Sequence, residues 1–187
     1  MSMNGFKTFQ TPRLLIRPVI EEDAPFIFEL LNTPKFLKFI GDRDVRSVEA
    51  AREYIRIKMF PQLEKLGFSN YAVIRKEDKL KLGTCGLYDR PGIEGIDIGF
   101  AFLPGHEKKG YAFEASSELM RAAEEDFGLC QINAITAKNN FSSQKLLEKL
   151  GFAYTKNVRL PGEEEEILFY EKKLNLESGT NVTERFT

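Results

Sequence analysis

The chain has 187 residues, which suits one domain with a sizeable core, and its 27 basic and 28 acidic residues nearly cancel. The balanced charge argues against a dedicated nucleic-acid binder, and no apolar run approaches the length of a membrane span. The first ten residues lack the apolar core of a signal peptide, and a single histidine, His106, excludes multi-histidine sites, so we expect a cytoplasmic protein without a metal.

The first half of the chain predicts a strand, two helices and a hairpin. Apolar periodicity predicts a strand over 14–19 and a helix over 21–31, with Pro34 soon after its end. Ser47 is a candidate N-cap for a second helix, which Pro61 should break or kink. Two strands expected to form a hairpin around a polar turn cover residues 71–75 and 80–88.

The second half predicts a βαβ unit, a short helix and a final pair of strands. The βαβ unit consists of a strand over 96–103, a helix over 110–127 and a strand over 131–136. A short helix over 143–150 follows, ended by Gly151. The last strands are expected over 152–157 and 167–173, on either side of an acidic loop. We interpret residues 1–174 as one domain and residues 175–187, which have little apolar content, as a frayed tail.

The segment from Pro104 to Met120, PGHEKKGYAFEASSELM, places a glycine-containing turn between a strand and a helix. The first N–H groups of a helix have no intrahelical partner and the helix dipole favours negative charge there, so this segment predicts a phosphate site. A P-loop is excluded because Tyr111 and Ala112 follow Gly110, and the sequence has no G-x-G-x-x-G run. On these residues alone, an ordinary turn with solvated lysines is an equal alternative.

A second segment, NNFSSQKLLEKLGF from Asn139 to Phe152, favours the phosphate site. Together with KKGYAFEA at 108–115, DIGF at 97–100 and the opening TPRLLIRPVIEEDA at 11–24, it resembles the GCN5-related N-acetyltransferase superfamily. The likeness is closest to the branch of ribosomal-protein-alanine acetyltransferases. The motifs occur in order and at the family's spacing over roughly residues 8 to 174.

The resemblance implies an α/β fold with a mixed, mostly antiparallel, twisted central sheet. That sheet should have six to seven strands and about four flanking helices, with two parallel middle strands, here 96–103 and 131–136, that splay apart. Acetyl-coenzyme A is the expected cosubstrate and lies in this gap. Its pantetheine arm should pair with the backbone near Phe102 and Leu103. Its pyrophosphate should lie on the amides of Lys108, Lys109, Gly110, Tyr111 and Ala112, with close approach at Gly110 because glycine has no Cβ.

The same resemblance places Asn140 and Ser143 against the coenzyme arm, although both residues could simply cap the short helix. Many relatives outside this branch have a tyrosine that acts as general acid where this chain has Leu147. We therefore expect Ser143 or a water molecule to protonate the leaving thiolate of coenzyme A. Glu107 and Lys108 also depart from the family, where an aromatic residue or Gln and then a glycine are frequent.

Asp97 is the candidate base, because strand alternation puts it on one face with the small residues Gly99 and Ala101. A structural ion pair is an equal alternative for this carboxylate, and the helix dipole alone can explain Glu114. An α-amine acceptor has a pKa near 8, against roughly 10.4 for lysine, so a weak base or a water relay would suffice.

We therefore expect an acetyl-coenzyme A-dependent N-acetyltransferase acting on a primary amine, foremost the N-terminal α-amine of a protein or peptide. The alternatives are acetylation of a small amine, amino acid or antibiotic, and a coenzyme A-binding sensor module without turnover. A monomer or homodimer is expected. Glu163 to Glu166 predict an acidic rim that attracts a cationic acceptor, unless they form an ordinary solvated surface. Cys85 and Cys130 are expected to be buried thiols.

Overall fold

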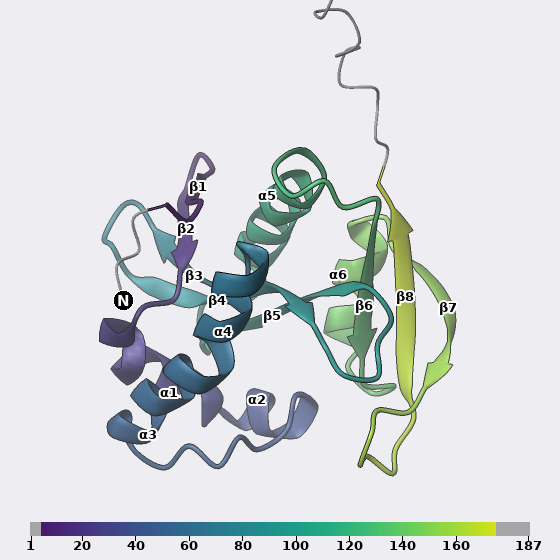
Figure 1. Cartoon of the computed structure of the whole chain (residues 1–187), viewed down its shortest axis with the longest axis horizontal. Coiled ribbons are helices and arrows are strands. Elements are labelled where there is room, and N and C mark those ends of the chain that lie inside the picture. The colour runs from purple at the N-terminus through teal and green to yellow at the C-terminus, as the bar shows by residue number, and fades with distance from the viewer. Residues whose placement is uncertain (1–4, 175–187) are drawn as a thin grey trace, which may run out of the picture.

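One sheet organises residues 5–174, the part of the chain that the computed structural model describes (Figure 1). Over these residues it has eight strands in the spatial order β1-β2-β3-β4-β5-β6-β8-β7, and only β5 and β6 are parallel neighbours. The strands are β1 (Phe9–Gln10), β2 (Leu14–Pro18), β3 (Asn70–Arg75), β4 (Lys81–Asp89), β5 (Ile96–Phe102), β6 (Gln131–Thr136), β7 (Ala153–Val158) and β8 (Ile167–Lys173). The tail expected over 175–187 lies outside the described residues.

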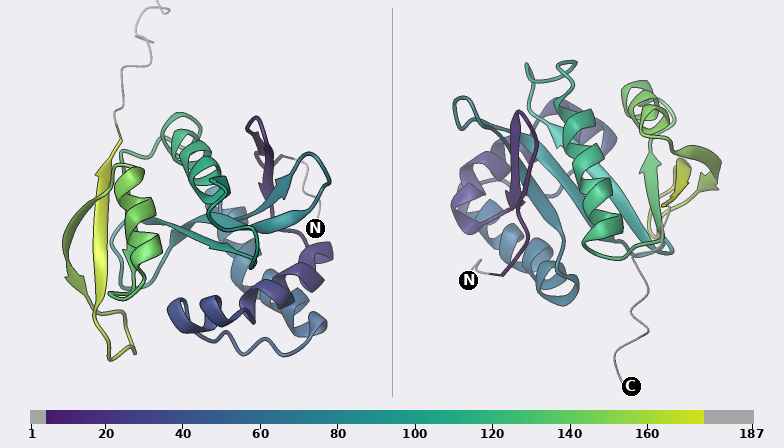
Figure 2. Two further views of the ribbon diagram at one scale, coloured as in Figure 1. Left: turned by 180° about the vertical axis from the view of Figure 1, so that it is seen from behind. Right: turned by 90° about the horizontal axis from the view of Figure 1, so that it is seen from above.

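Helices cover both faces of the sheet (Figure 2). They are α1 (Ala24–Leu31), α2 (Pro34–Phe39), α3 (Val48–Tyr54), α4 (Phe60–Leu66), α5 (Tyr111–Glu125) and α6 (Phe141–Lys149), with a 3₁₀ turn at Glu21–Asp23 and a π-helical turn at Ile55–Met59. The apolar residues of α1 to α4 form one core with Ala72 and Ile74 of β3. Those of α5 and α6 form a second core with Cys85, Leu87 and Ile98 on the other face. Each core removes apolar surface from water, which drives folding.

The parallel strands β5 and β6 pair in register at one position, Asp97 with Asn133. Although both strands lie wholly within the described residues, no further pair joins them after this point. Residues 98–102 and 134–136 thus present backbone groups that the other strand does not use. We call this unpaired stretch the splay; it confirms the predicted separation of the two middle strands.

The predicted fold class is confirmed, and the numbers of elements are corrected. The described sheet has eight strands where six to seven were expected, because β1 is a two-residue edge strand, too short to produce a periodic pattern. Helix α2 was also missed. Pro34 was interpreted as lying beyond a helix end, whereas it begins α2 and Thr33 caps it, accepting a hydrogen bond from the Phe36 N–H at 3.3 Å.

Pro61 was expected to break or kink the second helix; the helical run continues from Val48 to Leu66, but its α-helical part is interrupted just before the proline. The π-helical turn precedes it, and the Phe60 N–H bonds to the Ile55 carbonyl. This wider turn gives the proline ring room where an α-helix would clash. The cysteines are corrected as well: Cys85 is buried, which raises the pKa of its thiol to about 12, but Cys130 is exposed.

Candidate functional site

The turn that joins β5 to α5 has a backbone suited to binding an anion. Gly110 is the N-cap residue of α5 at φ +81°, and having no side chain it makes no capping hydrogen bond. The first-turn N–H groups of α5 are thereby left for a ligand. Lys108 also adopts a positive φ, +58°, which is uncommon outside glycine, so the lysine holds a conformation that a glycine would favour. Lys108 and Lys109 are exposed.

A cluster from the N-terminal strand region holds this turn against the sheet. The Arg13 guanidinium donates from Nε to Oε2 of Glu114 at 2.6 Å and from Nη1 to the Lys109 carbonyl at 3.1 Å. Thr11 donates to the other oxygen of Glu114 at 2.5 Å. The Arg13 guanidinium also lies 4.5 Å from the centre of the Tyr111 ring. Burial tends to raise the pKa of Glu114, but the bonds from Thr11 and Arg13 hold it below its usual value.

Helix α2 provides a second connection to the same turn. Lys35 of α2 forms a salt bridge with Glu107, the residue that departs from the family pattern. Both side chains are partly exposed, so the pair contributes little to stability. It nevertheless connects α2 to the turn.

At the start of α6, Asn140 acts as the N-cap. Its Oδ1 accepts hydrogen bonds from the Ser143 N–H at 3.2 Å and from the Ser142 hydroxyl at 3.1 Å. The capping role that the sequence left open for Asn140 is therefore present, while Ser143 is the residue being capped. Leu147, at the position of the missing tyrosine, is buried in the core and offers no proton.

Asp97 lies at the closed end of the splay and is fully buried. It forms a two-pronged ion pair with Arg90, at 3.0 Å to Nε and 3.1 Å to Nη2. Burial raises the pKa of the Asp97 carboxyl, and the Arg90 guanidinium opposes that rise. The ring of Tyr88 lies close to Gly99 on the same sheet face, where an added Cβ would come within 3.0 Å of it. As a base, Asp97 would have to leave its partner.

A pocket of about 320 Å³ lies between the β6–α6 connection and the β7–β8 loop. Glu166 in that loop accepts hydrogen bonds from Lys138 at 3.0 Å and from Asn157 at 3.2 Å. The bond from Lys138 holds the pKa of Glu166 below its usual value. Glu163, Glu164 and Glu165 are exposed, so the acidic rim is only partly neutralised.

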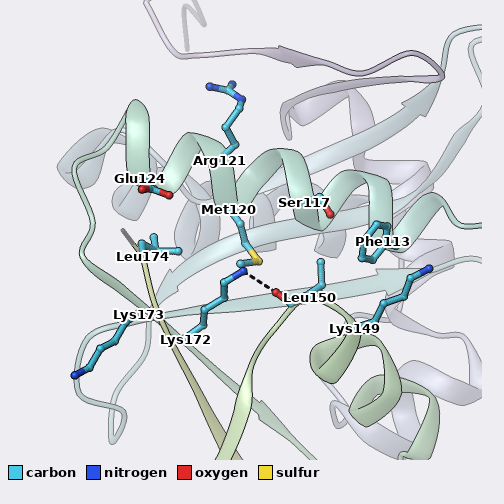
Figure 3. Close-up of a pocket in the computed structure, with 10 residues that line it drawn as sticks. All are labelled: Phe113, Ser117, Met120, Arg121, Glu124, Lys149, Leu150, Lys172, Lys173 and Leu174. Carbon is cyan, nitrogen blue, oxygen red and sulfur yellow. Dashed lines mark hydrogen bonds between the residues drawn. The ribbon is translucent and has the colours of Figure 1, made fainter. Parts of the chain in front are cut away.

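A second pocket, of about 390 Å³, lies along α5 on the side that faces α6 and the end of β8 (Figure 3). Lys172 of β8 points into it and donates to the Leu150 carbonyl at 2.7 Å. Lys149 lies 4.3 Å from the centre of the Phe113 ring. Its lining on α5 runs from Phe113 in the first turn of the helix to Glu124 near its end.

Most residues predicted for coenzyme binding are brought to one end of the parallel strands. Phe102 ends β5 and Leu103 follows it, the turn from Lys108 to Ala112 leads into α5, and Asn140 caps α6. Sequence reasoning missed Arg13 and Arg90. The opening TPRL motif contains Arg13 and was recognised as part of the family pattern, but no role was assigned to the arginine. Arg90 had no signal beyond its place in a turn.

Among the described residues 5–174, no helix is long and apolar enough to cross a membrane. Within the same range, no cluster of three or more His, Cys, Asp or Glu side chains is arranged to hold a metal ion.

Comparison with known proteins gives consistent results. Residues 13–153 match the family model described as an acetyltransferase (GNAT) domain. YoaA of Bacillus subtilis, named an uncharacterised N-acetyltransferase, is 28% identical over 148 residues, covering 79% of this chain and 83% of that protein. The p20 protein of Bacillus licheniformis, with the same description, is 30% identical over 148 residues, covering 78% of this chain and 82% of that protein.

Solved structures share the fold at low sequence identity. An acetyltransferase from Agrobacterium tumefaciens superimposes with a TM-score of 0.77 at 20% identity, covering 91% of this chain and 96% of that one. The spermidine N-acetyltransferase from Vibrio cholerae, solved with CoA and spermine, gives 0.72 at 17%, covering 87% and 96%. The ribosomal-protein-S5-alanine acetyltransferase from Vibrio fischeri gives 0.71 at 19%, covering 89% and 96%.

Proposed function

Because the chain belongs to the acetyltransferase (GNAT) domain family, and is thus an acetyl-CoA-dependent N-acyltransferase, we propose that its acceptor is the N-terminal α-amine of a protein or peptide. The acceptor amine attacks the thioester carbon directly, so a C–N bond forms while the C–S bond breaks. The amine gives up its proton, and the departing thiolate takes one up.

The turn before α5 and the splay support a path for the coenzyme. The amides between Lys109 and Ala112 receive the pyrophosphate at the N terminus of α5, and Lys108 and Lys109 add positive charge. The pantetheine arm enters the splay and pairs with the free backbone edge of β5 towards Phe102 and Leu103, as an added strand would. Asn140 and Ser143 lie at the start of α6, beside the open end of β6.

The observation that favours an α-amine is the state of the candidate base, Asp97, which is already engaged by a cation. Asp97, at the closed end of the splay, is held in a two-pronged ion pair by Arg90. An α-amine, with a pKa near 8, is partly neutral at physiological pH, whereas a lysine or polyamine amine near 10.4 needs a stronger base. With an α-amine, the rate can come largely from holding amine and thioester together. Ser143 or a water then protonates the thiolate.

A small amine is the second candidate acceptor, since the fold is shared with a spermidine N-acetyltransferase as well as with a ribosomal-protein-alanine acetyltransferase. A competition assay separates the two. Peptides that each carry one lysine, with a free or a blocked N terminus, are mixed with spermidine and acetyl-CoA, and products are identified by mass spectrometry.

We expect acetylation at the free α-amine and none on the blocked peptide. Acetylation confined to spermidine or to the lysine side chain would overturn the proposed acceptor. Binding of CoA without transfer to any acceptor would favour a sensor module instead.

A further inference from the structure

The last residue of β6, Thr136, carries a buried hydroxyl without a partner. Thr136 is only 6% exposed. Among the described residues 5–174, no group forms a hydrogen bond with the Oγ1 atom of Thr136. A buried hydroxyl that forms no hydrogen bond is unfavourable and needs an explanation. Thr136 therefore differs from an ordinary β-branched strand residue.

The position of Thr136 relative to the splay suggests that explanation. Its partner across the β6–β8 ladder is Leu168, but on the β5 side it lies three residues beyond the Asp97–Asn133 pair, where β5 and β6 no longer join. Strand alternation places Thr136 on the same face as Ile132 and Ala134, which pack in the core beneath α5 and α6. The hydroxyl thus lies on the β6 side of the splay, on the face of the two helices that begin beside it.

We propose that Thr136 is a coenzyme-binding residue whose hydroxyl hydrogen-bonds to an amide or thioester carbonyl of the pantetheine arm. The proposal rests on the proposed function, because it requires the arm to lie in the splay. The arm pairs with β5 through backbone groups on one side, and Thr136 supplies a polar contact from β6 on the other side. An unpaired hydroxyl in the free protein becomes paired in the complex, so the cost of burying it is recovered only on binding.

This assignment predicts an unusual pattern for Thr136→Val, which keeps the branched shape and removes the hydroxyl. Removing a hydroxyl that forms a hydrogen bond within the protein would destabilise the free protein. Thr136 has no such bond to lose, so the free variant should melt at the wild-type temperature or above it. Its dissociation constant for CoA should rise about fivefold, which is the effect of losing one neutral hydrogen bond. Thr136→Ser keeps the hydroxyl and should bind CoA nearly as the wild type does.

Tyr71 supplies a matched control, because its hydroxyl is also buried and unpartnered but lies on β3, away from the splay. Calorimetric titration with CoA and thermal unfolding with and without CoA are carried out on the wild type, Thr136→Val, Thr136→Ser and Tyr71→Phe. Weaker CoA binding in Thr136→Val alone, at unchanged stability of the free protein, is the expected result.

Wild-type affinity in Thr136→Val would overturn the assignment while leaving the proposed function intact. Lower stability of free Thr136→Val with unchanged CoA affinity would also overturn it, by showing a structural role. Failure of the wild type to bind CoA would overturn both this assignment and the proposed function.

Discussion

At Gly110 the backbone conformation and the missing side chain allow the turn to bind an anion. Its φ of +81° would strain any other residue by about 1–2 kcal/mol, and an added Cβ would lie 3.3 Å from the Arg13 guanidinium. We predict that Gly110→Ala lowers stability by about that amount and also weakens CoA binding about tenfold, since the Cβ occupies the surface that receives the pyrophosphate. Calorimetry and thermal unfolding measure the two effects.

Gly128 gives the control for that substitution. It has a φ of +66° at the other end of α5, with nothing within 4 Å of an added Cβ. Gly128→Ala should carry the same backbone strain and leave CoA affinity unchanged. Equal affinities in Gly110→Ala and Gly128→Ala would refute the placement of the pyrophosphate.

Arg13 fixes the turn through Glu114 and the Lys109 carbonyl, so it acts as a positioning residue. Arg13→Ala should raise the KM for acetyl-CoA about tenfold, the effect expected from losing a hydrogen bond to a charged group, with a smaller change in kcat. Lys7→Ala is the matched control, because Lys7 is about as exposed and pairs with Asp126 near the other end of α5. If steady-state kinetics show equal changes in both variants, the effect of Arg13 is one of general stability.

Among the elements, the junction of β2, α1 and β4 depends on one carboxylate. Asp23 is fully buried and bonds to Arg17 of β2 at 2.6 Å, to Lys81 of β4 at 2.6 Å and to the Ile20 N–H at 3.0 Å. Burial tends to raise the pKa of Asp23, but the bonds from Arg17 and Lys81 lower it overall. Its stabilising effect is present above the unfolded pKa of about 3.9 and is lost as pH falls through the lower folded pKa.

We predict that Asp23→Asn lowers the free energy of unfolding at pH 7 by about 3 kcal/mol, because Arg17 and Lys81 lose their shared partner. The loss should shrink as pH falls below about 4, because the carboxyl is then protonated in the unfolded chain, and it should vanish once pH falls below the lower folded pKa. Denaturant unfolding between pH 3 and pH 7 measures this. Asp42→Asn, at an exposed pair with Arg46, should change stability little. A loss for Asp23→Asn that stays constant with pH would contradict the charge argument.

The elements that the sequence predicts well are those with a strong period. The strand over Gln131–Thr136 and the last strand, Ile167–Lys173, match the expected ranges, and α5 begins one residue after its predicted start. Short elements were lost, because β1 and α2 contain too few residues for a pattern to repeat. An irregularity near Pro61 was expected, but its form was not, because the π-helical turn that accommodates the proline has no sequence signature.

For the site, sequence motifs predicted the turn and the start of α6, since those contacts are local in the chain. The Arg13–Glu114 and Asp97–Arg90 pairs could not be predicted in the same way. The first joins residues 101 positions apart, and the second depends on which way a loop side chain turns. The same holds for Thr136, whose missing partner becomes visible only when the neighbouring strand is seen to diverge.

Over the whole molecule, the charge is nearly balanced, yet Glu163, Glu164 and Glu165 gather in one exposed loop, which borders a pocket with the β6–α6 connection. Replacing these three residues by glutamine should raise the KM for a cationic acceptor at low ionic strength and leave the KM for acetyl-CoA unchanged. The difference should disappear near 1 M salt, where the Debye length is about 3 Å.

Three exposed glutamates elsewhere on the surface, Glu49, Glu64 and Glu77, provide a control with the same change in net charge. If both triple variants change the acceptor KM equally, the loop has no local role. An unchanged acceptor KM in the loop variant would favour an ordinary solvated surface.

The central claim is direct transfer from acetyl-CoA to an α-amine whose own pKa sets the reaction, since Asp97 is held by Arg90. The most direct measurement is the pH dependence of kcat/KM for two peptides whose α-amine pKa values differ by about one unit. We predict that kcat/KM rises about tenfold per pH unit, levels near each peptide's own pKa, and shifts between peptides by that difference. An inflection at the same pH for both peptides would show that a group on the protein removes the proton, and would contradict the account.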